Sequence, residues 1–276
     1  MRPIMQKHSL LRRSFGRIGI LSIVLLLALT ACSSNEERDA GRSAEELYAD
    51  AKASLDGRSY QTAIDRYRRL TTLYPFGRHA EQAQLDVAYA LQQARRPEEA
   101  LTTLDRFIRT YPTHPNIDYA WYLKGLVHYG EAMGLLRTLF PGQVVDRDQE
   151  SARLAFQDFQ ELIQRHPQSR YVADARQRMV FLRNVLAEYE ITVGEYYFRR
   201  KAYVAAIGRA QYVIENYVGA PANVNALDLL QRSYQKMDLP ELAADTGRVL
   251  ELNYADELEQ LDEEQPGWLS RLWPFD

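Results

Sequence analysis

The stretch Tyr60-Gln-Thr-Ala63-Ile-Asp-Arg-Tyr67, followed by Leu70 and Tyr74-Pro75, decides the fold because its spacing recurs along the chain. Each copy carries a small residue, large apolar residues at helical spacing and an aromatic or proline at its end. The later copies are Ala100, Leu104, Phe107 and Tyr111-Pro112; Ala155, Phe159, Leu162 and His166-Pro167; Tyr203, Ala206, Ala210, Val213 and Tyr217; and Ala243, Gly247, Leu250 and Tyr254. Ala63 and Ala100 are 37 residues apart, as are Ala206 and Ala243.

A second helical stretch precedes most copies, with a small residue twelve positions before the key alanine. Ala51, Ala88 and Gly194 hold this place, and Gly125 serves the third copy. Small residues let two antiparallel helices approach closely, and proline stops a helix because it lacks an N–H. These helix-turn-helix units resemble the tetratricopeptide repeat, in which stacked pairs bury one continuous core.

The sequence therefore predicts an all-α tetratricopeptide-repeat solenoid of five helix pairs, at 44–75, 81–112, 118–167, 172–217 and 223–254. We expect N-terminal repeats over 44–167 and C-terminal repeats over 168–256. The third unit carries about 18 extra residues, which we expect to form a loop over 132–149. The first helix of the fourth unit is predicted to run unbroken from Tyr171 to about Arg199.

The N-terminus reads as a lipoprotein signal peptide over residues 1–31. Five cations precede the apolar run Ile18 to Leu29, which is shorter than a membrane-spanning helix, and Leu29-Thr30-Ala31-Cys32 follows. Cys32 is the chain's single cysteine and the predicted lipidation site, at the start of a tether over 32–43. Ser33, in place of an aspartate, predicts export to the outer membrane. The alternative is a stray cysteine behind an ordinary signal peptide.

The mature chain is acidic. Without the five signal-peptide cations it has 29 basic against 37 acidic residues, a net charge of −8. This balance argues against nucleic-acid binding and against electrostatic attraction to anionic lipid, so membrane attachment is expected from the lipid alone.

No set of residues with catalytic or metal-binding spacing stands out in the sequence. No two of the five histidines lie three or four positions apart on a helix with a carboxylate partner. No phosphate-binding glycine loop or nucleophile motif is present. We therefore expect a binding scaffold with no cofactor and no metal, and not an enzyme.

The first helices of the early pairs predict a tyrosine-rich groove for an extended peptide with aromatic side chains. Its predicted residues are Tyr48, Lys52, Leu85, Tyr89, Tyr119 and Tyr122. The alternative for any one tyrosine is packing between helices.

The C-terminal segment 257–276 combines acidic residues with an aromatic end, Trp268 to Asp276. It looks like a docking segment, and the alternative is a tail that folds back on the last helix pair.

Several strings carry a more specific resemblance: Tyr74-Pro-Phe-Gly77, Asp105-Arg-Phe-Ile-Arg109, Pro112-Thr-His-Pro-Asn-Ile-Asp-Tyr119, Asp146-Arg-Asp148, and Val180-Phe-Leu182 with Glu195-Tyr-Tyr197. Together they resemble the BamD (ComL) family of outer-membrane assembly lipoproteins. The resemblance implies a subunit on the periplasmic face of the outer membrane that helps to fold and insert β-barrel proteins. Its implied partners are the periplasmic domain of BamA, BamC, BamE and unfolded outer-membrane proteins.

By that resemblance the N-terminal repeats receive the aromatic-ending strand of an unfolded barrel protein, and the C-terminal repeats hold the barrel subunit. Arg209 matches the family's arginine at the barrel-subunit contact. The alternative for Arg209 is a surface cation paired with a nearby carboxylate. Two other functions remain open: a periplasmic repeat lipoprotein that organises peptidoglycan or the cell envelope, and an enzyme with its site in the 132–149 loop.

Overall fold

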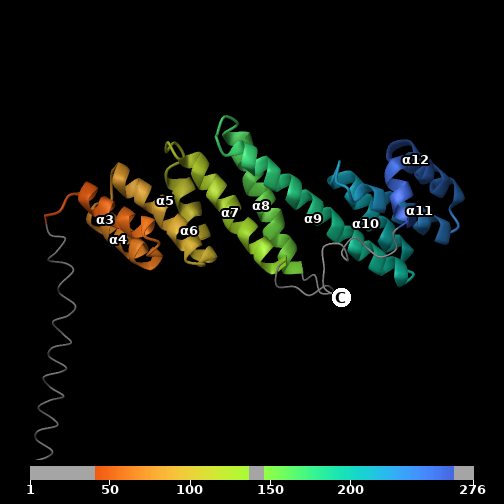
Figure 1. The fold of residues 1–276 in the computed structure, drawn as a ribbon, viewed down its shortest axis with the longest axis horizontal. Helices are drawn as coiled ribbons and strands as arrows, with labels where there is room; N and C mark the ends of the chain where they lie inside the picture. The colour runs from red at the N-terminus through yellow and green to blue at the C-terminus, as the bar shows by residue number, and fades with distance from the viewer. Residues whose placement is uncertain (1–40, 137–145, 264–276) are drawn as a thin grey trace, which may run out of the picture. The chain divides into compact units, whose positions relative to one another are not determined.

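The computed structural model describes residues 41–136 and 146–263, and the helices in these ranges are shown in Figure 1. The chain forms two compact units, Met1–Ala83 and Gln84–Asp276, and the boundary between them falls inside one helix. The described residues contain ten helices and no strand: α3 (Ala44–Asp56), α4 (Tyr60–Leu73), α5 (Arg78–Gln93), α6 (Pro97–Thr110), α7 (Ile117–Leu136), α8 (Asp146–Arg165), α9 (Val172–Arg199), α10 (Tyr203–Asn216), α11 (Asn223–Lys236) and α12 (Pro240–Glu263).

The predicted all-α repeat fold is confirmed, with five successive helix pairs among the described residues. In the first unit α3 packs on α4, and in the second unit each helix from α6 to α12 packs on the next. Helices α4, α6 and α8 end two residues before Pro75, Pro112 and Pro167, as the restriction that proline places on the preceding residue requires. The long helix α9 also matches its prediction.

Four of the five pairs share one turn geometry that the sequence did not predict. Arg58, Arg95, Lys201 and Asp238 all have φ between 56° and 61°, in the left-handed region. In each turn the next residue's N–H donates to the carbonyl five positions earlier, the hydrogen bond of a Schellman motif. Glycine usually holds this position, so the backbone of these four residues is locally strained. The strain is offset because the turn gives hydrogen-bond donors to the last carbonyl groups of the helix.

Small residues occupy the places where paired helices approach most closely. The key alanines are buried, and Gly125 of α7 lies directly over the ring of Phe159 on α8. A Cβ on Gly125 would stand 2.5 Å from the Phe159 ring, inside the distance that packed atoms tolerate. The spacing of small and large residues in the sequence is therefore the spacing of contacts in the core.

The structure corrects two predicted boundaries. Of the loop expected over 132–149, α7 takes residues up to Leu136 and α8 begins at Asp146, so the interhelix segment is 137–145. The acidic run after residue 256 continues α12 to Glu263, beyond a kink at Tyr254. Both extensions have one cause: good helix formers, such as Met133 and Leu135 in α7 and Leu258 and Glu259 in α12, extend an existing helix at little cost. The two compact units divide within α5, and the grouping into N-terminal repeats over 44–167 and C-terminal repeats over 168–256 stays a prediction.

Two glycines of α7 provide a matched test of this packing. We expect Gly125→Ala to lower the free energy of unfolding by about 1–3 kcal/mol, because the added methyl overlaps Phe159. Gly130 is exposed on the same helix, and a methyl group added there would meet nothing within 4 Å, so Gly130→Ala should raise stability by up to about 1 kcal/mol. Urea unfolding measures both, and equal effects would contradict the close approach of α7 and α8.

Candidate functional site

The predicted groove residues of the first unit are Tyr48 and Lys52, both on α3. The Tyr48 ring is half-buried and packs against the rings of Tyr67, at 5.5 Å between centroids, and His79, at 5.3 Å. Lys52 is exposed and forms an ion pair with Asp56 one turn along the helix. One edge of Tyr48 is therefore available at the surface while its other contacts are structural.

The second unit gathers the other predicted tyrosines, Tyr89 of α5 and Tyr119 and Tyr122 of α7, near Tyr171 at the N-terminus of α9. Tyr122 stacks on Tyr171 with ring centroids 4.6 Å apart and planes 13° from parallel. Tyr119 packs against the same Tyr171 ring at 5.5 Å. The Tyr122 hydroxyl donates a 2.7 Å hydrogen bond to Asp174 Oδ2, which also accepts from Arg178. We call Tyr89, Tyr119, Tyr122 and Tyr171 the tyrosine cluster; all four are half-buried.

Burial raises the pKa of two tyrosines in the cluster, Tyr119 and Tyr122. It raises the pKa of Tyr119, and the nearby Tyr89, Tyr171 and Asp86 add to the effect. Burial also raises the pKa of Tyr122, helped by the hydrogen bond to Asp174. The Tyr119 and Tyr122 hydroxyls therefore stay protonated near neutral pH. That of Tyr122 already donates to Asp174, and that of Tyr119 can act as a hydrogen-bond donor beside the rings.

One predicted groove residue is wrong. Leu85 is fully buried in the core of the helix stack, so its side chain cannot line a groove. The prediction failed because Leu85 sits on the face of α5 that meets neighbouring helices, and repeat spacing alone does not tell that face from the open one. Tyr171 was missed, since it stands at the N-terminus of α9 outside the periodic pattern.

An ionic network lies near this cluster. Lys124 of α7 contacts Asp158 of α8 at 3.3 Å and Asp105 of α6 at 3.0 Å. His128, one turn further along α7, shares a 2.6 Å hydrogen bond with Asp158. Burial opposes the charge on Lys124, but the two carboxylates outweigh it and raise its pKa. The network ties three consecutive helices together, and it holds His128 in a structural contact.

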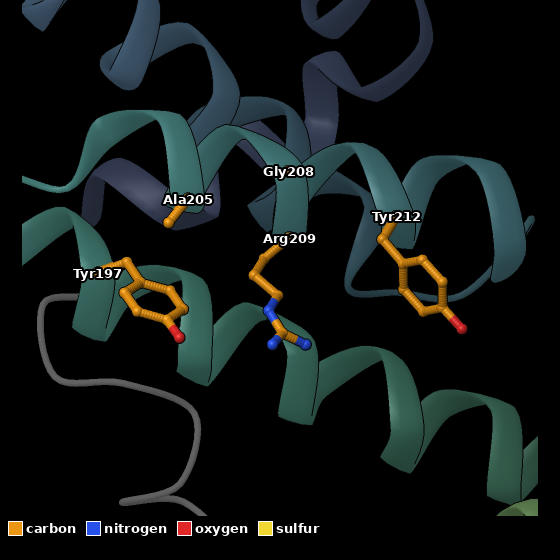
Figure 2. Close-up of a pocket in the computed structure, with 5 residues that line it drawn as sticks. All are labelled: Tyr197, Ala205, Gly208, Arg209 and Tyr212. Atoms are coloured by element: carbon orange, nitrogen blue, oxygen red, sulfur yellow. The ribbon is translucent and has the colours of Figure 1, made fainter.

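Arg209 of α10 lies in a shallow pocket of about 360 Å³ with Tyr197, Ala205, Gly208 and Tyr212. Figure 2 shows its guanidinium pointing from α10 toward α9, between the two tyrosine rings. Nη1 donates to Glu190 Oε2 at 2.6 Å, and this hydrogen bond raises the Arg209 pKa.

The partner of Arg209 is buried and shared. The Glu190 side chain is 2% exposed, whereas that of Arg209 is 41% exposed. Arg153 of α8 approaches the other Glu190 oxygen at 3.5 Å. Glu190 therefore links α8, α9 and α10, and it fixes the direction of a guanidinium that still presents donors to the surface. Sequence reasoning placed Arg209 correctly on α10 but did not find Glu190.

Glu188, two residues from Glu190, has a different environment. Its Oε2 is buried and has no hydrogen-bond partner among the residues that the structure describes. Burial raises the Glu188 pKa to about 7. No sequence signal distinguished this glutamate from the solvated ones.

Within 41–136 and 146–263, no three His, Cys, Asp or Glu side chains gather as a metal site would require. In the same ranges no helix joins enough length to enough apolar character to span a bilayer. Cys32 and the Trp268 to Asp276 tail lie outside the described residues.

The structure is that of a tetratricopeptide-repeat protein, because successive helix pairs approach closely at small residues. The sequence profile of the family YfiO, described as an outer membrane lipoprotein, matches residues 40–250. The chain belongs to this family.

Relatives extend over most of the chain. A protein of Neisseria meningitidis serogroup B called outer membrane protein assembly factor BamD is 43% identical over 241 residues, covering 85% of this chain and 90% of the relative. A Vibrio cholerae protein of the same name is 35% identical over 235 residues, covering 85% and 96%.

Two solved structures are more distant. The TPR2AB domain of yeast Sti1, in a complex with pHSP90, has 16% identity and a TM-score of 0.42, covering 76% of this chain and 77% of that one. The MamA protein has 14% identity and a TM-score of 0.36, covering 81% and 97%.

Glu188 generates a pH prediction. A carboxyl whose pKa is raised on folding contributes stability below its unfolded pKa, and this contribution is lost as pH rises through about 7. We expect Glu188→Gln to unfold at a higher temperature than the parent at about pH 8 and at nearly the same temperature at about pH 4.5. Exposed Glu251→Gln is the control for the change of charge. A Glu188→Gln effect that does not depend on pH would contradict the buried, unpaired carboxyl.

Proposed function

We propose that this chain is a lipid-anchored scaffold subunit of the machinery that assembles β-barrel proteins in the outer membrane. Its N-terminal repeats bind unfolded barrel proteins, and its C-terminal repeats bind the barrel subunit. Membership of an outer-membrane lipoprotein family and relatives named as assembly factors support this role over the organisation of peptidoglycan. Cys32 carries the acyl chains that hold the protein on the periplasmic face of the outer membrane.

The observation that carries the proposal is the oriented guanidinium of Arg209. An arginine pinned on one side by buried Glu190 and flanked by two tyrosines keeps part of its donor fork exposed. Such a group binds a partner carboxylate without first losing the freedom of a mobile side chain. Arg209 is therefore the proposed contact for the periplasmic domain of the barrel subunit, BamA. BamC and BamE complete the proposed assembly.

The tyrosine cluster is the proposed substrate surface. Its rings are half-buried, so each has a packed face and an open edge, and the Tyr119 and Tyr122 hydroxyls remain protonated. The C-terminal strand of a barrel protein offers an aromatic last residue and unpaired backbone acceptors. Flat rings match the aromatic last residue and tolerate varied sequences, and the Tyr119 hydroxyl offers a donor to a backbone acceptor. Tyr48 and Lys52 are proposed as substrate contacts of the first unit.

A four-variant cycle separates binding by Arg209 from its structural contact. Arg209→Gln should weaken binding of the barrel subunit's periplasmic domain at least about tenfold, because a positioned charge is lost. It should also lower stability, since Glu190 keeps only Arg153. The double variant Glu190→Gln with Arg209→Gln should recover part of that stability but none of the affinity. Isothermal titration and urea unfolding measure the two quantities.

Glu190→Gln completes the cycle and serves as the control, because it retains the guanidinium and should retain most of the affinity. The proposal is wrong if the double variant recovers binding along with stability. That result would make Arg209 a structural partner of Glu190 and nothing more.

Conservative and truncating substitutions at Tyr122 test the substrate surface. Tyr122→Phe keeps the ring and loses the bond to Asp174, so it should retain affinity for a peptide ending in phenylalanine. Tyr122→Ala should weaken that binding roughly two- to tenfold, the value of one aromatic contact of about 0.5–1.5 kcal/mol. A peptide without its terminal aromatic should bind both variants equally. If Tyr122→Ala lowers only the melting temperature, with both peptides bound as by the parent, the ring is structural.

A further inference from the structure

The loop between α4 and α5 exposes a large apolar side chain that does not pack in the core. Phe76 is 90% exposed, more than any other large apolar residue in the described part of the chain, and Leu73 and Tyr74 beside it are also exposed. We call residues 73–77, which are the last residue of α4 and the loop after it, the anchor-side loop. Single exposed apolar residues are common, but three within four positions at the end of a helix and in its following loop indicate an interaction.

The loop is fastened to the point where the N-terminal tether leaves the first unit. The Tyr74 hydroxyl donates a 2.6 Å hydrogen bond to the backbone carbonyl of Arg42, 32 residues earlier. Arg42 directly precedes Ser43, the N-cap of α3, and stands ten residues after Cys32. The nine residues between Cys32 and Arg42 span at most about 30 Å when extended. The loop is therefore held within reach of whatever Cys32 is attached to.

The loop is also preorganised. Gly77 has φ +98°, a conformation that a side chain would resist, and its carbonyl accepts the N–H of Ala80 to start α5. Pro75 fixes the backbone one residue before Phe76. The aromatic side chain is thus presented from a restrained backbone, and little entropy is lost when it enters a contact.

We propose that the anchor-side loop is a second membrane contact, which places Phe76 and Tyr74 in the headgroup region of the leaflet that holds the Cys32 acyl chains. This inference rests on the lipid anchor of the proposed function and revises the expectation that the lipid alone makes contact. Aromatic side chains favour the membrane–water interface, where the ring is buried and a tyrosine hydroxyl stays hydrated. Tethering makes a weak contact effective by raising its local concentration. The contact fixes the orientation of the first unit on the membrane.

The test uses the acylated full-length mature chain bound to vesicles of phosphatidylethanolamine and phosphatidylglycerol. Cys32 is the chain's single cysteine and is acylated in this form, so a new cysteine is the sole free thiol. Arg78→Cys, at the exposed start of α5, carries an environment-sensitive fluorophore beside an intact Phe76. Ser59→Cys, exposed in the turn at the opposite end of α3 and α4 from Arg42 and Tyr74, carries the same fluorophore as the control.

We expect spin-labelled lipid to quench the fluorophore at residue 78 and aqueous iodide to quench the one at residue 59. Adding Phe76→Ser should cut the lipid quenching at residue 78 at least about twofold while the protein still floats with the vesicles. Flotation with iodide quenching at both positions overturns this proposal and leaves the anchor intact. Lipid quenching that Phe76→Ser does not change overturns it too, and so does shielding that requires an added partner protein. A chain that does not float refutes the anchor and, with it, this contact.

Discussion

The close approach of paired helices at small residues is the constraint on which the rest of this structure depends. Gly125 lets α7 approach the ring of Phe159, and Gly194 lets α9 approach Leu229 and the Cβ of Arg209. A methyl at Gly194 would stand 2.6 Å from Leu229 and 3.3 Å from Arg209. The close packing of α10 on α9 therefore also brings Arg209 within hydrogen-bond distance of Glu190. The same helix contact forms the core and positions the candidate site.

Glu190 shows how a costly group is used in such a fold. A buried carboxylate is stable only when it is paired, and Arg153 and Arg209 pair it from two different helices. The arrangement adds little to stability compared with an apolar core, but it fixes the direction of one surface guanidinium. The tyrosine cluster follows the same logic, since Asp174 orients the hydroxyl of Tyr122 while the ring keeps an open edge.

The repeat architecture was predictable because it depends on residue spacing. Five helix pairs, the long α9 and the proline-limited ends follow from the 37-residue period and from proline chemistry. The turns at Arg58, Arg95, Lys201 and Asp238 were not predictable, because a left-handed residue other than glycine leaves no compositional mark. The sequence placed Leu85 in the groove wrongly, because burial depends on which neighbour covers a helix face.

The candidate site was predicted only in part. Arg209 came from the resemblance to a family, and Tyr119 and Tyr122 came from the repeat periodicity. Glu190 contacts Arg209, and Tyr171 stacks on Tyr122. Glu190 and Arg209 are 19 residues apart in sequence. Tertiary packing brings such residues together, so the repeat pattern did not predict these contacts.

The assembly role itself is tested most directly by depleting the protein from its own cells and measuring folded β-barrel proteins in the outer membrane. We predict that heat-modifiable, folded barrels fall as the protein is depleted, that unfolded barrel chains accumulate in the periplasm, and that peptidoglycan composition changes only afterwards. Unchanged levels of folded barrels with an early change in peptidoglycan would contradict the account and favour an organiser of the cell envelope.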